Sequence, residues 1–129
     1  MKNIKLGLII AAGILLVAAC ATPVLNIANA PLQTGSGQKI SLDQAGKAIT
    51  AAGATLGWQM ETVSLGNIVG TLKLRSHVAV VNISYDTQSY SINYKDSVHL
   101  NYDGSRIHPN YNGWIQNLDK GIRAQLGTL

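Results

Sequence analysis

The sequence predicts an α+β protein: a two-layer sandwich in which a four-stranded antiparallel meander carries an N-terminal and a C-terminal helix on one face. Apolar residues recur at helical spacing over 42–56 and over 111–126, and between them they alternate with polar residues. The helical spacing produces one apolar face on each helix, and the alternation produces one apolar face on the sheet. The predicted order is helix, four strands, helix (α-β-β-β-β-α), with short loops that favour antiparallel neighbours. Both helices should cover the apolar sheet face.

The first helix is predicted over residues 42–56. Ser41 precedes it and Gln44 follows three residues later, which is a capping-box pattern. Gly57 is the expected C-cap. Gly46 and Gly53 each cost about 1 kcal/mol of helix propensity relative to Ala, which favours close packing against a neighbouring element. The apolar stripe of this helix is Leu42, Ala45, Ile49, Ala52 and Leu56.

Four strands follow, each with one apolar face. A tight turn is predicted at Gly66-Asn67, a break near Ser76 and a further turn over 86–88. The expected inward positions are Trp58, Met60 and Thr62, then Ile68, Gly70, Leu72 and Leu74, then Ala79, Val81, Ile83 and Tyr85, and finally Tyr90, Ile92 and Tyr94.

The last helix follows a loop over 101–112 that is rich in turn-forming residues. Asn110 or Asn112 is the expected N-cap, because asparagine side chains readily accept from the first free amides of a helix. The stripe that should face the core is Tyr111, Ile115, Leu118, Ile122 and Leu126, with Trp114 beside it.

Residues 1–19 are predicted to be a secretion signal. Lys2 and Lys5 make a positive start, and Leu6 to Ala19 is an unbroken run of fourteen apolar or small residues. As a helix this run would be about 21 Å long, which is shorter than the roughly 30 Å hydrocarbon core of a bilayer. A removable signal peptide therefore explains it better than a membrane-spanning anchor.

The end of this run, Val17-Ala18-Ala19-Cys20, resembles the lipobox of bacterial lipoproteins. The resemblance implies cleavage before Cys20, a diacylglyceryl group on its thiol and an acyl group on its freed amine, with no other cofactor. Two or more acyl chains anchor a protein stably. The alternative is an ordinary signal peptide that is cut at another small-residue site, such as the one ending at Ala30. Cys20 is the sole cysteine, so no intramolecular disulfide can form.

Localisation follows from the residue after the cysteine. In the sorting pattern of enteric lipoproteins, Ala21 in place of aspartate implies the outer membrane, facing the periplasm, over the inner membrane. Residues 20–39 are rich in Pro, Asn, Gly and Ser, so a lipidated flexible tether with a reach of about 25 Å is expected there. The remaining residues, 40–129, are expected to form one domain.

Charge argues against a nucleic-acid partner. The chain has ten Lys and Arg residues and six Asp and Glu residues, and the signal peptide takes two of the lysines with it. The mature chain is then close to neutral and has no basic cluster, which nucleic-acid binding needs. The expected partners are the membrane, through the lipid anchor, and an envelope protein or peptidoglycan.

Catalytic and metal-binding patterns are weak. The histidines His77, His99 and His108 match no compact ligand spacing, although imidazole is a common metal ligand. Asp96, Ser97 and His99 are the residue types of a triad, but on one strand the aspartate would face away from the other two. The chain has one glutamate and five aspartates, a thin supply for paired-carboxylate chemistry.

The most distinctive segment runs from Tyr90 to Trp114, where tyrosines and asparagines interleave. It could form a polar binding surface, since tyrosine offers an aromatic face with a hydrogen-bonding tip. Alternatively, Tyr90 and Tyr94 belong to the core and the asparagines serve turns and caps.

Three stretches of the domain resemble a group of small uncharacterised proteobacterial lipoproteins: residues 75–79, 90–97 and 107–115. The likeness covers most of the mature domain and implies no particular activity. It suggests a candidate binding surface around the last strand and the final helix, made of Ser97, His108, Tyr111, Asn112 and Trp114.

Three functions remain open at this point. The first is a non-enzymatic binding module of the envelope, and the second is a small metal-binding protein or hydrolase that uses His99 and His108. The third is a lipid-anchored structural protein, which a uniformly polar outer sheet face without a concavity would favour. Close approach of the imidazoles of His99 and His108 would favour the second.

Overall fold

The computed structural model describes residues 21–129, so the predicted signal peptide and Cys20 lie outside the described residues. The first part of this range holds β1 (Thr22–Pro23), β2 (Ile27–Pro31), α1 (Leu42–Thr55), β3 (Gln59–Ser64) and β4 (Asn67–Leu74). The second part holds β5 (His77–Tyr85), β6 (Ser89–Val98), β7 (Arg106–Ile107) and α2 (Pro109–Gly127).

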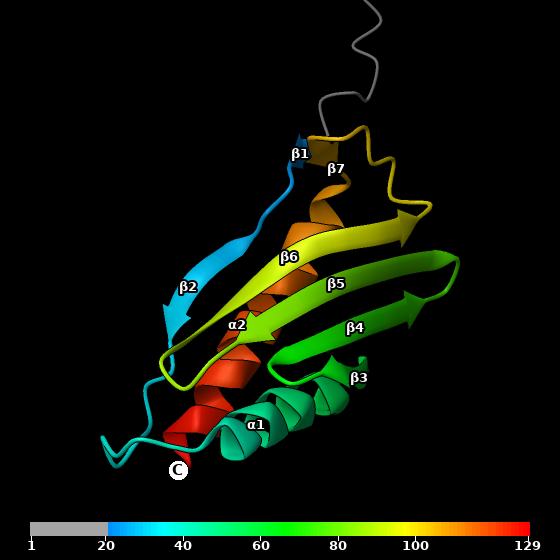
Figure 1. The fold of residues 1–129 in the computed structure, drawn as a ribbon. Coiled ribbons are helices and arrows are strands. Elements are labelled where there is room, and N and C mark those ends of the chain that lie inside the picture. Colours follow the sequence, from blue (N-terminus) through cyan, green and yellow to red (C-terminus); the bar gives the residue numbers. More distant parts are fainter. Residues whose placement is uncertain (1–20) are drawn as a thin grey trace, which may run out of the picture.

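The main sheet is antiparallel and has the strand order β2-β6-β5-β4-β3. Its strands β3 to β6 are neighbours in chain order, which confirms the predicted meander. The two helices pack together against one face of this sheet (Figure 1). The α+β two-layer fold is therefore confirmed, with a fifth strand added beside β6. The short strands β1 and β7 pair separately.

The fifth strand comes from the segment predicted to be a flexible tether. In β2, Ile27 lies opposite Ile92 and Ala30 lies opposite Tyr90. Further along, the amides of Gly35 and Ser36 donate to carbonyls at the end of the chain. The prediction of a flexible tether over 20–39 is thus wrong for the described part. β2 is an edge strand that ends in proline, and its pairing with β6 stabilises it. Its own sequence therefore does not show the alternation of apolar and polar residues that would predict a strand.

The core lies between the sheet and the two helices. The stripe predicted for the last helix is confirmed, since all five of its members are fully buried. Three residues predicted to face inward are exposed instead: Leu56 follows the last turn of α1, Thr62 borders an open groove beside α1, and Leu74 is the last residue of β4. The fully buried inward positions of β5 and β6 include Ala79, Val81, Ile83 and Ile92.

Helix α1 begins as predicted. The Ser41 hydroxyl accepts from the Gln44 amide, and the Gln44 side chain accepts from the Ser41 amide, which is a complete capping box. The glycines of this helix are explained by close packing. A Cβ on Gly46 would lie 2.5 Å from the Tyr85 hydroxyl, and one on Gly53 would lie 2.5 Å from the Met60 sulfur.

A polar cluster ties β6 to α2 inside this core. The Tyr90 hydroxyl donates to Asp119 Oδ1 over 2.5 Å, and Arg123 pairs with the other carboxylate oxygen. Tyr90 and Asp119 are buried, whereas the Arg123 side chain reaches solvent. Burial, followed by the neighbouring Asp119, raises the pKa of Tyr90. The tyrosine therefore stays protonated and donates to the carboxylate.

Candidate functional site

The first turn of α2 is organised by His108. This residue is the N-cap, and its Nδ1 accepts from the Asn110 amide over 3.1 Å. The predicted cap at Asn110 or Asn112 is therefore wrong. Pro109 explains the difference. Proline lacks an amide hydrogen and its fixed φ suits the first helical position, so Pro109 takes that position and the residue before it, His108, is the cap.

Replacing His108 with alanine should lower the free energy of unfolding by about 1 kcal/mol, because one helix-end amide loses its acceptor. Replacing it with aspartate should preserve stability, since that carboxylate also caps and suits the positive end of the helix dipole. Urea unfolding of both variants measures the difference. Asn110→Ala is the matched control, because only its backbone takes part in the cap. A loss of the same size in His108→Asp would contradict the cap assignment.

Asn112 holds the beginning of the described chain against α2. Its Oδ1 accepts from the Leu25 amide over 2.9 Å. Its Nδ2 donates to the Pro23 carbonyl over 2.9 Å and to the Thr22 hydroxyl over 3.1 Å. All hydrogen-bonding atoms of this amide are therefore engaged within the domain. Asn112 was predicted to line the binding surface, and the structure places it as a clamp on the N-terminal segment.

Three tyrosines gather where β6 passes α2. The rings of Tyr94 and Tyr102 are stacked, with centroids 3.9 Å apart, and Tyr111 meets Tyr94 edge-on at 5.7 Å. Tyr111 is fully buried, and its hydroxyl has no hydrogen-bond partner among residues 21–129. Burial, followed by the nearby Tyr94 and Tyr102, raises the pKa of Tyr111. A protonated phenol without a hydrogen-bond partner among the described residues thus lies beside Tyr94.

Tyr111→Phe should leave the free energy of unfolding unchanged or raise it by up to about 1 kcal/mol, because the substitution removes a buried polar group without breaking a protein hydrogen bond. Tyr90→Phe is the matched comparison, since its hydroxyl is bonded and its loss should be destabilising. Thermal and urea unfolding of the two variants provide the measurement. A loss in Tyr111→Phe as large as that in Tyr90→Phe would show that the Tyr111 hydroxyl is paired in solution.

An irregularity in β6 sets the position of Ser97. Val81 lies opposite Tyr94, but Val80 lies opposite Asp96, so Lys95 is an extra residue on this strand. The bulge returns Ser97 to the inner face shared with Tyr94, and the two hydroxyls lie 2.7 Å apart. Sequence alternation alone would have placed residues 94 and 97 on opposite faces.

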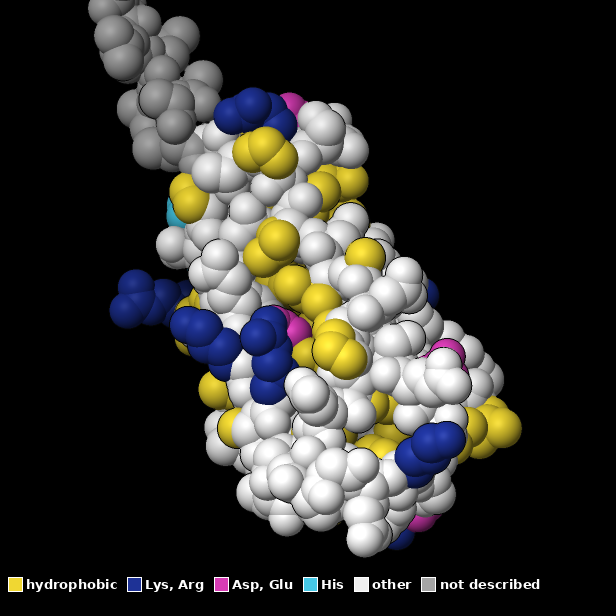
Figure 2. Space-filling model, turned by 90° about the vertical axis from the view of Figure 1, so that its left-hand side faces the viewer, with side chains coloured by type: hydrophobic (Ala, Val, Ile, Leu, Met, Phe, Trp, Pro, Cys, Tyr) yellow, Lys and Arg dark blue, Asp and Glu magenta, His cyan; other side chains and the backbone are white. Residues whose placement is uncertain are grey.

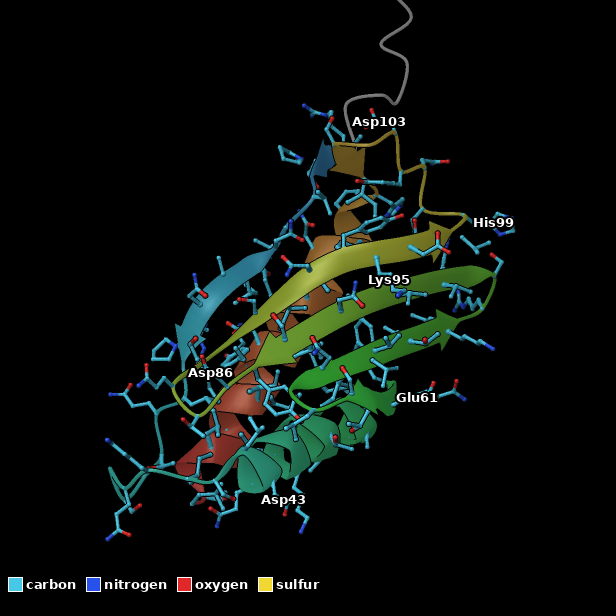
Figure 3. The ribbon with its side chains drawn as sticks, viewed as in Figure 1. Asp43, Glu61, Asp86, Lys95, His99 and Asp103 are labelled. Carbon is cyan, nitrogen blue, oxygen red and sulfur yellow. The ribbon has the colours of Figure 1, made fainter. Side chains whose placement is uncertain are left out.

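The triad residue types do not assemble around Ser97. Its hydroxyl is paired with Tyr94, and its amide donates to the carboxylate of Asp96. His99 instead lies beyond the end of the strand, where its Nδ1 faces the Ser76 carbonyl over 3.0 Å. Figure 3 shows His99 at this tip, beyond the end of β6. These contacts give the serine no imidazole base, which a nucleophile of this type requires.

The three histidines come closer than their sequence spacing suggests. The His77 ring lies 6.1 Å from that of His108 and 6.4 Å from that of Trp114, measured between centroids. Its Nδ1 faces the His99 carbonyl over 2.9 Å. His77 therefore lies beside the predicted surface, although it was not among the residues chosen for it. Within the described range, no three His, Cys, Asp or Glu side chains converge in an arrangement suited to a metal ion.

A shallow cavity of about 450 Å³ opens beside the stacked tyrosines. Its floor includes Leu100, which is buried, between two residues with left-handed backbone: His99 with φ 58° and Asn101 with φ 52°. Asparagine and histidine adopt this conformation more readily than most residues, and here it turns the chain on both sides of Leu100. The complete lining is Tyr94, Asp96, Ser97, His99, Leu100, Asn101 and Tyr102.

Four of the five residues of the predicted surface thus fall into two groups, and the fifth, Asn112, is the clamp on the N-terminal segment. Ser97 and Tyr111 meet at Tyr94, while His108 and Trp114 meet at His77. Sequence reasoning did not assign Tyr94 and Tyr102 to the wall of this cavity, and it did not place His77 beside His108 and Trp114. The interleaved tyrosines were a usable signal for the first two, but no pattern links His77 to the final helix.

No protein family, no characterised protein and no solved structure matches this chain significantly. The fold therefore defines it only as a two-layer α+β domain. Neither helix of residues 21–129 has the length and apolar character that crossing a bilayer requires.

Proposed function

We propose that this chain is a membrane-anchored lipoprotein of the cell envelope, held in the outer membrane and facing the periplasm, whose domain is a binding module without catalytic activity. The lipobox at 17–20 supports the anchor. The cavity beside the stacked Tyr94 and Tyr102 is the observation that carries the binding function.

The lining of this cavity suits a polar ligand with flat apolar faces. Tyr102 is 37% exposed, so part of its ring is open to a ligand while Tyr94 holds it from behind. Asp96 supplies a carboxylate, and Asn101 an amide, at the edge of the same cavity. Sugar rings combine apolar faces with hydroxyl groups that such side chains can bind. Peptidoglycan is the envelope component that best fits this chemistry.

The metal-binding or hydrolytic alternative that uses His99 and His108 receives less support. The Nδ1 of His108 is engaged in capping α2, and the Nδ1 of His99 faces a backbone carbonyl. A metal would have to compete for these atoms or use only the remaining nitrogen of each ring. The third possibility, a purely structural protein, offers no explanation for the cavity beside Tyr94 and Tyr102.

Binding is tested with the full-length lipoprotein in detergent and soluble muropeptides, the glycan-peptide fragments of peptidoglycan. Tyr102→Ala should weaken binding by up to about tenfold, because the aromatic face contributes about 0.5–1.5 kcal/mol. Tyr102→Phe, which keeps the ring, is the matched control and should retain most of the affinity. Lack of muropeptide binding by the wild type, with an envelope protein crosslinked at this surface instead, would replace peptidoglycan by a protein partner.

The anchor is tested by replacing Cys20 with serine. The variant should carry no fatty acid and should leave the membrane fraction or remain unprocessed, because a hydroxyl at this position does not receive the lipid in proteins with a lipobox. Metabolic labelling with a fatty acid, together with the intact mass, measures this outcome. Unchanged acylation would overturn the lipoprotein assignment.

A further inference from the structure

We propose that one end of this domain rests directly on the bilayer that holds its lipid anchor. The contact surface, called here the anchor-end surface, consists of the exposed residues Pro23, Tyr102, Asp103, Gly104, Ser105 and Arg106. This inference rests on the proposed lipidation of Cys20. It adds what that proposal leaves open, namely the orientation of the domain and the surface that meets the lipid.

The distance from the anchor to the domain is short. Ala21 alone separates Cys20 from Thr22, the first residue of β1. Consecutive Cα atoms are about 3.8 Å apart, so the lipidated residue lies within about 8 Å of this strand along the chain. A flexible segment over 20–39 would have allowed about 25 Å. The acyl chains must therefore enter the bilayer right beside the folded domain.

The first described residues are fixed to the domain by several contacts. Arg106 donates from its guanidinium to the Ala21 carbonyl over 2.6 Å, and the Val24 amide donates to the Ser105 carbonyl over 2.9 Å. The three hydrogen bonds of Asn112 hold the same segment from the side of α2. These bonds keep residues 21–25 on the domain, so any pivot between the domain and its anchor is confined to the backbone bonds around Cys20 and Ala21.

The loop that completes this surface has a defined shape. The Asp103 carboxylate accepts from the amides of Ser105 and Arg106, over 3.0 and 2.8 Å, and these bonds lower its pKa. The Tyr102 hydroxyl donates to the Gly104 carbonyl. Figure 3 places Asp103 at the end of the domain that carries β1 and β7, and Asp43 at the opposite end.

The chemistry of the surface suits the headgroup region. Tyrosine and arginine are the side chains that place an apolar part toward acyl chains and a polar end in the interface. The Arg106 guanidinium has five donors, so donors remain for a lipid phosphate after Ala21 is bound. Figure 2 shows cationic, acidic and apolar side chains together at this end of the domain. The acidic Asp103 offsets the charge of Arg106, so headgroup contact does not require anionic lipid.

Tyr102 belongs both to this surface and to the cavity beside it. A domain that rests on the anchor-end surface would therefore present the cavity at the level of the lipid headgroups. Its ligand would be bound close to the membrane rather than deep in the periplasm.

The test uses the full-length lipoprotein in vesicles of phosphatidylethanolamine and phosphatidylglycerol, with a fluorophore on one added cysteine and a quencher on lipid headgroups. The thiol of a lipidated Cys20 is blocked, so only the added cysteine reacts. Ser105→Cys places the fluorophore on the anchor-end surface, and Lys47→Cys places it on α1. We expect quenching several-fold stronger at position 105 than at position 47.

A second version carries a Gly/Ser linker of about twelve residues between Ala21 and Thr22, with a reach of about 19 Å. Its quenching at position 105 should fall to the level at position 47. Equal quenching at the two positions without the linker, or no change with it, would overturn the inference. Intact mass separates this failure from that of the proposed function: a lipidated protein with equal quenching refutes only the orientation, and a protein without fatty acid refutes both.

Discussion

Replacing Asp119 with alanine should lower the free energy of unfolding by about 2–3 kcal/mol, one of the largest single effects expected in this domain. The substitution leaves the buried Tyr90 hydroxyl without an acceptor and opens space between β6 and α2. Tyr90 is 1% exposed, so water has little access to its hydroxyl to replace the lost acceptor. Urea unfolding followed by circular dichroism measures the change.

A double-mutant cycle isolates the interaction between the two side chains. Tyr90→Phe alone leaves a buried carboxylate oxygen unpaired, with Arg123 still holding the other oxygen. The double variant Tyr90→Phe/Asp119→Ala removes both polar partners, so its loss should be smaller than the two single losses combined, by about 1–2 kcal/mol. Additive losses would show that the hydroxyl and the carboxylate do not interact in solution.

Lys47→Ala provides the matched control for the charged pair of Asp119 and Arg123. Lys47 and Asp43 form the same i,i+4 arrangement on α1, but their side chains are 77% and 75% exposed. Exposed pairs of this kind contribute little, so the variant should change stability by less than about 0.5 kcal/mol. If Lys47→Ala lowered the free energy of unfolding as much as Asp119→Ala, burial would not explain the large effect expected at Asp119.

Asn112→Ala should release the N-terminal segment locally, with a loss of about 2 kcal/mol in the stability of residues 22–31. The substitution removes three hydrogen bonds, and the amide of Leu25 loses its acceptor. Hydrogen exchange at the amides of Val24 and Leu25 should accelerate by about thirtyfold, since each 1.4 kcal/mol is a factor of ten. Exchange in the central strand β5 should change far less, because local opening does not require global unfolding.

The comparison variant is Asn112→Asp. It keeps the acceptor for Leu25 but loses both donated bonds, so its exchange rates should fall between those of the wild type and the alanine variant. Asn110→Ala removes an exposed amide in the same helical turn and should leave exchange at residues 22–31 unchanged. If Asn112→Ala left that exchange unchanged, the clamp would not be what orders the segment.

The order of helices and strands could be predicted from the sequence because each depends on local periodicity. Alternation over residues 58–94 specified which face of β4, β5 and β6 is buried, and the helical stripe from Tyr111 to Leu126 specified the inner face of α2. The capping box at Ser41 was also predictable, since its partner is three residues away. The lipobox is likewise a local pattern, and the role of Cys20 stays a prediction.

Only the tertiary structure decided the features that join distant segments. β2 is a strand because β6 lies beside it, and Asn112 is a clamp because residues 22–25 pass over its helix. The bulge at Lys95 places Ser97 beside Tyr94, and no alternation rule anticipates an extra residue. Periodicity reports the environment of each residue one element at a time, whereas these contacts depend on how the elements meet. The candidate site, and the short path from Ala21 to the folded domain, belong to this second class.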